Sequence, residues 1–314
     1  MKNGLARFEL YLDRLEKLLG EAAGQKDPAL WLFQNGARTP MFMLEGLAKL
    51  YGGLHNEKKF EKIRERFKLL EDALGAIDYY DSFAKEFSAD KKVSAGVTKS
   101  VQSKAGEAAK LLNELLIKKN WIGKDAKRIG KIRKKLGDAE WLEDKAEMKA
   151  IDEFYRDSIK EINAFAKSYD KGFTELETQV HELRRKLRWL SIYPQALQGC
   201  IQLTENASTD KTLAKYLTPE IVNSPFNKMP DAGANRYLLM FDKDRFLALS
   251  WMISELGRLK DQGLRIVALN ETGVASKTDS KNEAEILTKA TDICRGFFAE
   301  KNLDKIINGV VNAS

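Results

Sequence analysis

Apolar residues recur at three- and four-residue steps along most of the chain, with charged residues between them. This spacing places the apolar side chains on one face of a helix, as in an amphipathic helix that covers a core. It is clearest in a run that ends near Gly20–Gly24 and in a longer run over about 57–87. The apolar residues are Leu5, Phe8, Leu12, Leu15 and Leu19 in the first run and Phe60, Ile63, Phe67, Leu70 and Leu74 in the second.

The same spacing predicts further helices along the rest of the chain. They cover about 101–119, 124–136, 139–168 and 174–192, and then about 210–222, 236–262 and 283–308. Gly, Asn or Pro stands at most of the junctions, as is usual where helices end. No alternation typical of strands persists, and only Leu264–Leu269 fits either structure. The pattern therefore predicts an all-α fold with long helices.

The segment Thr204–Ala234 differs in character from the helical runs. It contains three of the six prolines and begins with a stretch rich in Thr, Asn and Ser. Long connections of this kind are more often functional or mobile than structural. We expect a peripheral surface excursion that carries one short helix, Leu213 to Val222.

Bulk properties favour an intracellular globular protein. The chain of 314 residues can form one large domain or two of ordinary size. The N-terminal stretch is charged throughout, unlike a signal peptide, and no uncharged apolar run approaches about 18 residues. Cys200 and Cys294 are far apart in helix-like surroundings, which predicts two buried free thiols in a reducing compartment. We therefore expect a cytoplasmic protein that does not enter a membrane.

Four basic residues share one face of the helix predicted over 174–192. Helical phase brings together His181, Arg184, Arg185 and Arg188, and it places Val180, Leu183, Leu187 and Leu190 on the opposite side. Three arginines and a histidine within about two turns repel one another unless acids or an anion neutralise them. The alternative to an anion site is a solvated face that pairs with acids of a neighbouring helix.

A second basic stretch runs from Lys118 to Lys135 and holds nine Lys and Arg residues against the single Asp125. At a rise of about 1.5 Å per residue, its cations form a helical stripe more than about 15 Å long. These cations are Lys124, Lys127, Arg128, Lys131, Lys134 and Lys135. A lone basic helix often serves solubility alone, but two basic faces in one fold favour an extended anion such as polyphosphate, nucleic acid or acidic lipid. The net charge of +7 permits such a partner without requiring it.

No catalytic or cofactor-binding pattern is recognisable in the sequence. No Ser or Cys nucleophile has an evident His partner, and no Gly-rich phosphate loop or dinucleotide motif occurs. Two His and two scattered Cys do not make a zinc site of ordinary spacing. The carboxylates alternate with lysines, as on ordinary exposed helices. We therefore expect a protein that is not an enzyme and that needs no cofactor or metal.

The spacing His181-x-x-Arg184-x-x-x-Arg188 resembles the signature of the conserved histidine α-helical domain (CHAD) family. In that family a later helix carries a Leu-Gly…Asp element, and the whole unit occurs twice. This chain shows the second element twice, as Leu74-Gly75…Asp78 and as Leu256-Gly257…Asp261. A glycine inside a helix costs about 1 kcal/mol relative to alanine, so its repetition suggests close helix packing.

The resemblance implies two antiparallel helical bundles related by a pseudo-twofold axis, with basic residues lining a groove. We expect an N-terminal half over 1–170 and a C-terminal half over 171–314, with the two Leu-Gly elements at equivalent positions. The first half departs from the family pattern, because 38–49 has neither the histidine nor the arginine spacing. If the resemblance holds, this chain is a divergent member whose N-terminal half has a degenerate His/Arg block.

The activity that the resemblance implies is binding of inorganic polyphosphate without chemistry. The expected polyphosphate-binding residues are those of the two basic faces: His181, Arg184, Arg185 and Arg188, together with Lys124, Lys127, Arg128, Lys131, Lys134 and Lys135. Two other functions stay open at this point. They are a helical protein–protein scaffold without an anion role, and a nucleic-acid binder.

Overall fold

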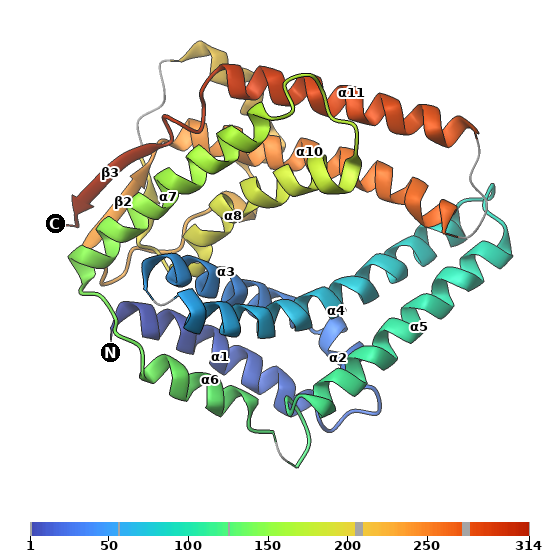
Figure 1. Ribbon diagram of the computed structural model, residues 1–314, viewed down its shortest axis with the longest axis horizontal. Coiled ribbons are helices and arrows are strands. Elements are labelled where there is room, and N and C mark those ends of the chain that lie inside the picture. Colours follow the sequence, from blue (N-terminus) through green and yellow to red (C-terminus); the bar gives the residue numbers. More distant parts are fainter. Residues whose placement is uncertain (1, 56, 125, 205–209, 272–276, 314) are drawn as a thin grey trace. The chain divides into compact units, whose positions relative to one another are not determined.

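The computed structural model describes residues 2–55, 57–124, 126–204, 210–271 and 277–313 (Figure 1). It confirms a mainly α-helical fold, with three short strands among these residues. The chain divides into two compact units, Met1–Leu142 and Glu143–Ser314. The boundary therefore lies ahead of residue 170, because the helix that precedes that position packs with the second unit.

Unit 1 contains only helices among its described residues. They are α1 (Asn3–Ala22), α2 (Pro28–Gln34), α3 (Arg38–Leu54), α4 (Glu57–Ala89), α5 (Ala95–Lys118) and α6 (Arg128–Gly137). Helix α3 packs on both α1 and α4, and α5 packs along α4. The predicted runs near 5–19 and 60–74 bury nearly all of their apolar faces, with Phe8, Phe60 and Phe67 fully inaccessible to solvent and Leu5 partly exposed.

One arginine of α6 forms ion pairs with α1, on which the helix also packs. The guanidinium of Arg133 donates hydrogen bonds to Glu9, Asp13 and Glu16, at 2.7, 2.5 and 2.6 Å. Burial acts to lower the pKa of Arg133, but the hydrogen bonds to Glu16 and Glu9 outweigh it and raise that pKa above its usual value. This arginine therefore serves the packing of α6.

Unit 2 combines helices with the three strands. It consists of α7 (Asp144–Lys167), the π-helical segment η1 (Leu176–His181), α8 (Glu182–Ala196), β1 (Ile201–Leu203), the 3-10 segment η2 (Lys211–Tyr216), α9 (Pro219–Val222), the 3-10 segment η3 (Pro225–Asn227), β2 (Tyr237–Phe241), α10 (Lys243–Asn270), α11 (Lys277–Ala299) and β3 (Ile307–Asn312). In the sheet, β2 is central: Leu239 pairs with Ile201 of parallel β1 and with Val310 of antiparallel β3.

Three sequence predictions need correction in unit 2. Residues 237–241 form a strand rather than the start of a helix, and the last predicted helix ends at Ala299, so that 307–312 is a strand. The helix predicted over 213–222 is interrupted at Leu217 and Thr218, where Thr218 caps the next helix by accepting from the amide of Ile221. Strands of three to six residues are too short to show a persistent alternation.

The segment between β1 and β2 is anchored by buried side chains, although it runs over the surface. Leu213 and Tyr216 are almost fully buried and η2 packs on α10, whereas Phe226 is 82% exposed. The Asn- and Ser-rich entry of this segment, 205–209, lies outside the described residues. The predicted excursion is therefore a surface connection with firm attachment points.

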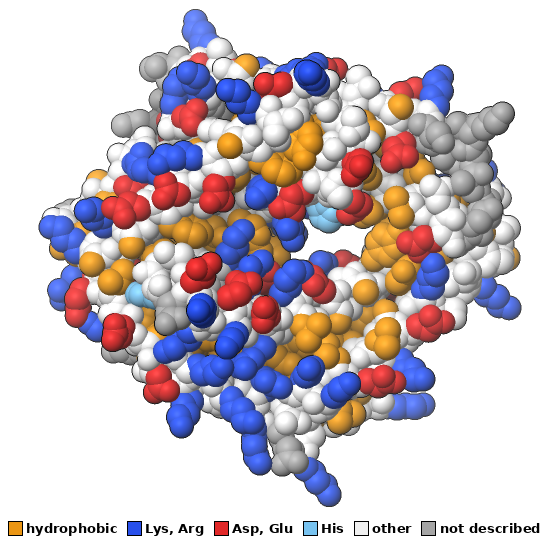
Figure 2. Space-filling view, in the orientation of Figure 1, with side chains coloured by type: hydrophobic (Ala, Val, Ile, Leu, Met, Phe, Trp, Pro, Cys, Tyr) orange, Lys and Arg blue, Asp and Glu red, His pale blue; other side chains and the backbone are white. Residues whose placement is uncertain are grey.

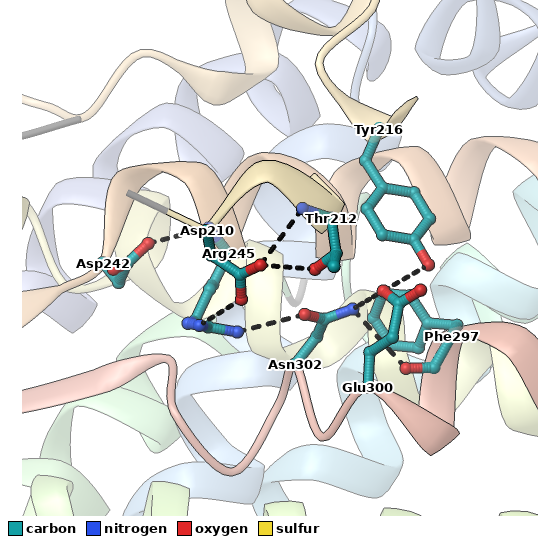
Figure 3. A network of polar contacts seen from close by, with 8 residues as sticks. All are labelled: Asp210, Thr212, Tyr216, Asp242, Arg245, Phe297, Glu300 and Asn302. Atoms are coloured by element: carbon teal, nitrogen blue, oxygen red, sulfur yellow. Dashed lines mark hydrogen bonds and ion pairs between the residues drawn. The ribbon is translucent and has the colours of Figure 1, made fainter. Parts of the chain in front are cut away.

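A polar network attaches this connection to α10 and to the segment after α11 (Figure 3). Arg245, which is buried, donates to Asp210 and to Asn302, both at 3.1 Å. Glu300 accepts from the hydroxyl of Tyr216 at 2.8 Å and from the amide of Asn302 at 3.1 Å. Burial raises the pKa of Tyr216 to about 12. Buried polar groups that are satisfied in this way fix the relative positions of the elements that carry them.

Candidate functional site

The predicted His/Arg block lies across the junction of η1 and α8. Its helical phase is confirmed, because Leu183 and Leu187 are fully buried on the opposite side while Arg185 and Arg188 are exposed. His181 ends the π-helical segment, and Arg184 stands in the first turn of α8. The four side chains nevertheless have different environments.

Arg184 is a packing residue. It lies over Gly257 of α10 and donates from Nε to the carbonyl oxygen of Ile253 at 3.2 Å. A Cβ atom on Gly257 would be 3.0 Å from this Nε, so the glycine makes room for the guanidinium. Burial lowers the pKa of Arg184, and the charge of Asp261 acts in the opposite direction. The glycine of the second Leu-Gly element is therefore needed for close contact with an arginine of the basic block.

Two other members of the block pair with acids of their own helical stretch. The Nδ1 atom of His181 is 2.8 Å from a carboxylate oxygen of Glu177, and Arg185 is 2.7 Å from Glu182. The hydrogen bond from His181 lowers the pKa of Glu177. Acids therefore offset part of the positive charge that the sequence concentrates on this face.

Unit 1 contains the same arginine–glycine contact. Arg38, the first residue of α3, lies over Gly75 of α4, where an added Cβ would be 3.1 Å from its Nη2 atom. Its guanidinium donates to Glu71 at 2.7 Å and to Asp78 at 2.8 Å. In each unit an arginine of one helix thus packs on the glycine of the Leu-Gly element in a long helix. The acceptor oxygens at Glu71 and Ile253 both belong to the residue four positions before the glycine.

The second basic stretch is less helical than expected. Helix α6 begins at Arg128, so Lys124 and Lys127 precede it and do not continue the stripe, and Asp125 lies outside the described residues. The backbone turns sharply before the helix, with positive φ at Asn120 and Gly123. The helical part of the stripe spans only Arg128–Lys135, about 10 Å at 1.5 Å per residue. Lys131 and Lys134 are exposed on it, and Lys135 is partly exposed.

Cations of α4 extend this shorter stripe into a wider surface. We use the name α4/α6 cationic face for the residues Lys59, Lys62 and Arg66 of α4 together with Arg128, Lys131 and Lys135 of α6. In both helices the cations follow the spacing n, n+3 and n+7, which places each set on one helix face. Figure 2 shows Lys and Arg side chains gathered over this part of unit 1.

The cations at the centre of the α4/α6 cationic face repel one another. The charge of Arg66 is the largest cause that lowers the pKa of Lys135, followed by burial and by the charges of Lys62, Arg128 and Lys59. Burial and Arg128 lower the pKa of Arg66, against the effect of Glu65. In addition, the Nη1 atom of Arg66 is buried without a hydrogen-bond partner among the described residues. Repulsion within such a cluster destabilises the fold, and an anion that neutralises the cations relieves it.

Backbone carbonyl groups hold the edges of this face in position. Lys59 donates to the carbonyl oxygen of Asp138 at 2.7 Å, and Arg128 donates from Nε to that of Lys119 at 2.8 Å. Arg128 also lies over the ring of Trp121, 6.0 Å from its centre. A neutral carbonyl group and an aromatic face orient Arg128 without neutralising it, so its charge stays available to a ligand.

Sequence reasoning found the α6 half of this face and missed the α4 half. The signal was present, since Lys59, Lys62 and Arg66 have the same spacing as Arg128, Lys131 and Lys135. It was obscured because α4 also carries many acids, such as Glu61 and Glu65, between and beside these cations. Only the tertiary structure of unit 1 brings both sets of cations together.

No protein-family model, curated protein or solved structure matches this chain.

Across the described residues, no group of three or more His, Cys, Asp or Glu side chains has a geometry that would hold a metal ion. In the same part of the chain, none of the helices has the length and hydropathy that crossing a bilayer requires. Cys200 and Cys294 are both buried and free, as predicted, and burial raises the pKa of the Cys294 thiol to about 12.

Proposed function

We propose that this chain binds a polyanion without chemically changing it, and that the ligand is inorganic polyphosphate held mainly on the α4/α6 cationic face. The observation that carries the proposal is the gathering of cations from α4 and α6 on one face, where Arg66, Lys62, Arg128 and Lys59 stand close enough to Lys135 to lower its pKa together with burial. Natural surfaces usually intersperse acids among such cations. A face that keeps its repulsion gains most when a multiply charged anion neutralises it.

The chemistry of the face suits phosphate. Arginines such as Arg66 bind two phosphate oxygens at once through parallel N–H groups, whereas lysines act as mobile point charges. The resemblance to the CHAD family, together with the arginine–glycine contact in each unit, supports polyphosphate over other polyanions.

The His/Arg block contributes less in this proposal than the sequence alone suggested. Arg184 is engaged with Gly257 and Ile253, and His181 and Arg185 are paired with acids. Arg188 is exposed and remains a candidate contact residue. Replacement of Arg184 therefore tests packing rather than anion binding.

The proposal can be tested by titration with long-chain polyphosphate, duplex DNA and single-stranded RNA at two salt concentrations. We expect polyphosphate to bind most tightly, and its affinity to fall steeply with salt because binding releases counterions. Preference for either nucleic acid would favour the alternative of a nucleic-acid binder. Absence of binding to all three at low salt would refute the proposal and favour a protein–protein scaffold.

Two double variants of equal charge locate the site. Lys62→Gln/Lys135→Gln removes two cations of the α4/α6 cationic face, and Arg185→Gln/Arg188→Gln removes two of the His/Arg block. Each charge-assisted hydrogen bond is worth roughly 1.5–3 kcal/mol before screening, so we expect the first variant to weaken polyphosphate binding by at least about tenfold. We expect the second to weaken it by less than about threefold. The reverse order would move the site to α8.

A further inference from the structure

A cavity in unit 1 lies beside the α4/α6 cationic face. Its volume is about 710 Å³, within the usual range for sites that bind small molecules. It is formed by the end of α3, the start of α4 and the segment that follows α6, with the lining residues His55, Lys59, Phe60, Asp138, Ala139, Glu140, Trp141 and Leu142. All of these residues belong to unit 1.

The cavity has aromatic walls of fixed orientation. The ring of His55 is parallel to that of Tyr51, with centres 5.7 Å apart and planes 4° apart, and it faces the edge of Trp141 at 5.6 Å. Trp141 packs edge-on against Phe60 at 5.8 Å, and its Nε1–H donates to the carbonyl oxygen of Leu136 at 3.0 Å. Contacts on several sides therefore hold these rings before any ligand arrives, which favours a flat aromatic ligand.

Lys59 belongs both to the cavity and to the α4/α6 cationic face. It lines the cavity, and its charge is one of the causes that lower the pKa of Lys135. Asp138 and Glu140 line the same cavity, and their negative charges repel a phosphate group inside it. They accept hydrogen bonds from an exocyclic amino group instead. The cavity therefore suits a neutral ring with amino groups, and the neighbouring cations suit phosphate.

We propose that the cavity takes the base of a nucleoside 5′-polyphosphate whose phosphate chain lies on Lys59, Lys62 and Lys135. This inference rests on the proposed function, because the same cations would hold the phosphates. It adds a second class of ligand, in which an aromatic base supplies binding energy that inorganic polyphosphate lacks. An amino-bearing purine such as adenine fits the acceptors that Asp138 and Glu140 present.

The test compares ATP, inorganic tripolyphosphate and adenosine by isothermal titration calorimetry without divalent cations. Tripolyphosphate carries at least as much negative charge as ATP, so a preference for ATP reports the base. We expect ATP to bind at least tenfold more tightly than tripolyphosphate, a difference of about 1.4 kcal/mol. His55→Ala should reduce this ratio to below threefold and leave the affinity for tripolyphosphate unchanged. His181→Ala in unit 2 is the matched control and should keep the ratio.

Saturation-transfer NMR on the unmodified protein keeps the inference testable if His55→Ala does not fold. The base protons of ATP should receive saturation from the protein in proportion to their burial. If polyphosphate binds but ATP binds no better than tripolyphosphate, or if its base protons receive no saturation, the inference is overturned and the proposed function stands. If neither ATP nor any polyphosphate binds, both fail together.

Discussion

Removal of two lysines from the α4/α6 cationic face should stabilise the protein while it weakens anion binding. The variant is Lys62→Gln/Lys135→Gln. In an ordinary exposed helix a lysine-to-glutamine change is close to neutral for the free energy of unfolding, usually within about 0.5 kcal/mol. Here both lysines stand among other cations, which lower the pKa of Lys135. Their replacement relieves repulsion that exists only in the folded state.

The magnitude follows from the helical neighbours of the two lysines. Within α4, Lys62 has three like charges at positions three or four residues away, Lys58, Lys59 and Arg66, against one acid, Glu65. Lys135 has one like charge at that spacing, Lys131. Each like pair costs about 0.2–0.5 kcal/mol and the acid offsets one of the four, which leaves a net relief of about 0.6–1.5 kcal/mol. Repulsion between α4 and α6 adds to this value, and salt reduces it.

Chemical denaturation and thermal melting at low salt measure the effect. A relief of about 1 kcal/mol should raise Tm by about 2–4 °C for a unit of this size. The control is Lys99→Gln/Lys110→Gln on α5, which changes the net charge equally. Lys110 has Glu107 and Glu114 at helical spacing, so we expect this control to be neutral or slightly destabilising. If both variants lower Tm equally, or if high salt does not erase their difference, the assignment of a repulsive cluster is wrong.

Three further outcomes are expected. Gly257→Ala should destabilise unit 2 by about 1–3 kcal/mol, because the new Cβ displaces Arg184, and should become neutral or stabilising when combined with Arg184→Ala in a double-mutant cycle. The pairing of Glu177 with His181 lowers the pKa of Glu177 below 4.5. The contribution of this pair to the free energy of unfolding is therefore present above about pH 4.5 and is lost as the pH falls through the lowered pKa. In pH-dependent denaturation, the stability difference between His181→Ala and the unmodified protein should shrink over that acidic range. Tyr216→Phe removes one hydrogen bond to Glu300 and should cost about 1 kcal/mol in chemical denaturation, whereas a cost near zero would show that this part of the network contributes little.

The helical periodicity of the sequence predicted most of the long helices, because their burial is one-sided. Helices α1, α4, α7 and α10 each cover a core with one face, and that requirement is visible in a single sequence. Helices α2 and α3 were missed. Apolar residues surround Pro40, Gly46, Gly52 and Gly53 in α3, so that its buried face does not stand out from the rest. The strands β1, β2 and β3 depend on pairing between distant segments, which local pattern does not encode.

For the candidate site, the sequence identified which faces are basic but not which charges remain available. Helical phase correctly placed Arg184 opposite Leu183 and Leu187, yet the contact with Gly257 requires the packing of two helices that are far apart in sequence. The same is true of Arg133, which looks like any other cation of α6 until Glu9, Asp13 and Glu16 are found around it. Whether a cation can bind a ligand therefore depends on which distant residues the fold places beside it.

The order of elements in the two units explains why the candidate site does not coincide with the His/Arg block. In unit 1, α1, α3, α4 and α5 come in this order along the chain, with α2 between the first two, and each of the four packs on the next. In unit 2, α7, the stretch η1–α8, α10 and α11 show the same sequence of contacts. The arginine–glycine pair joins the second and third members of each series, Arg38 to Gly75 and Arg184 to Gly257.

Helix α6 has no counterpart in this series among the described residues of unit 2, where β3 follows α11 instead. Half of the α4/α6 cationic face therefore comes from an element outside the shared pattern. A site formed by the shared elements would be expected in both units, whereas a site that needs α6 belongs to unit 1 alone. Because Lys62 and Lys135 come from α4 and α6 respectively, the single variants Lys62→Gln and Lys135→Gln should show how much binding depends on a helix of the shared contact order and how much on α6.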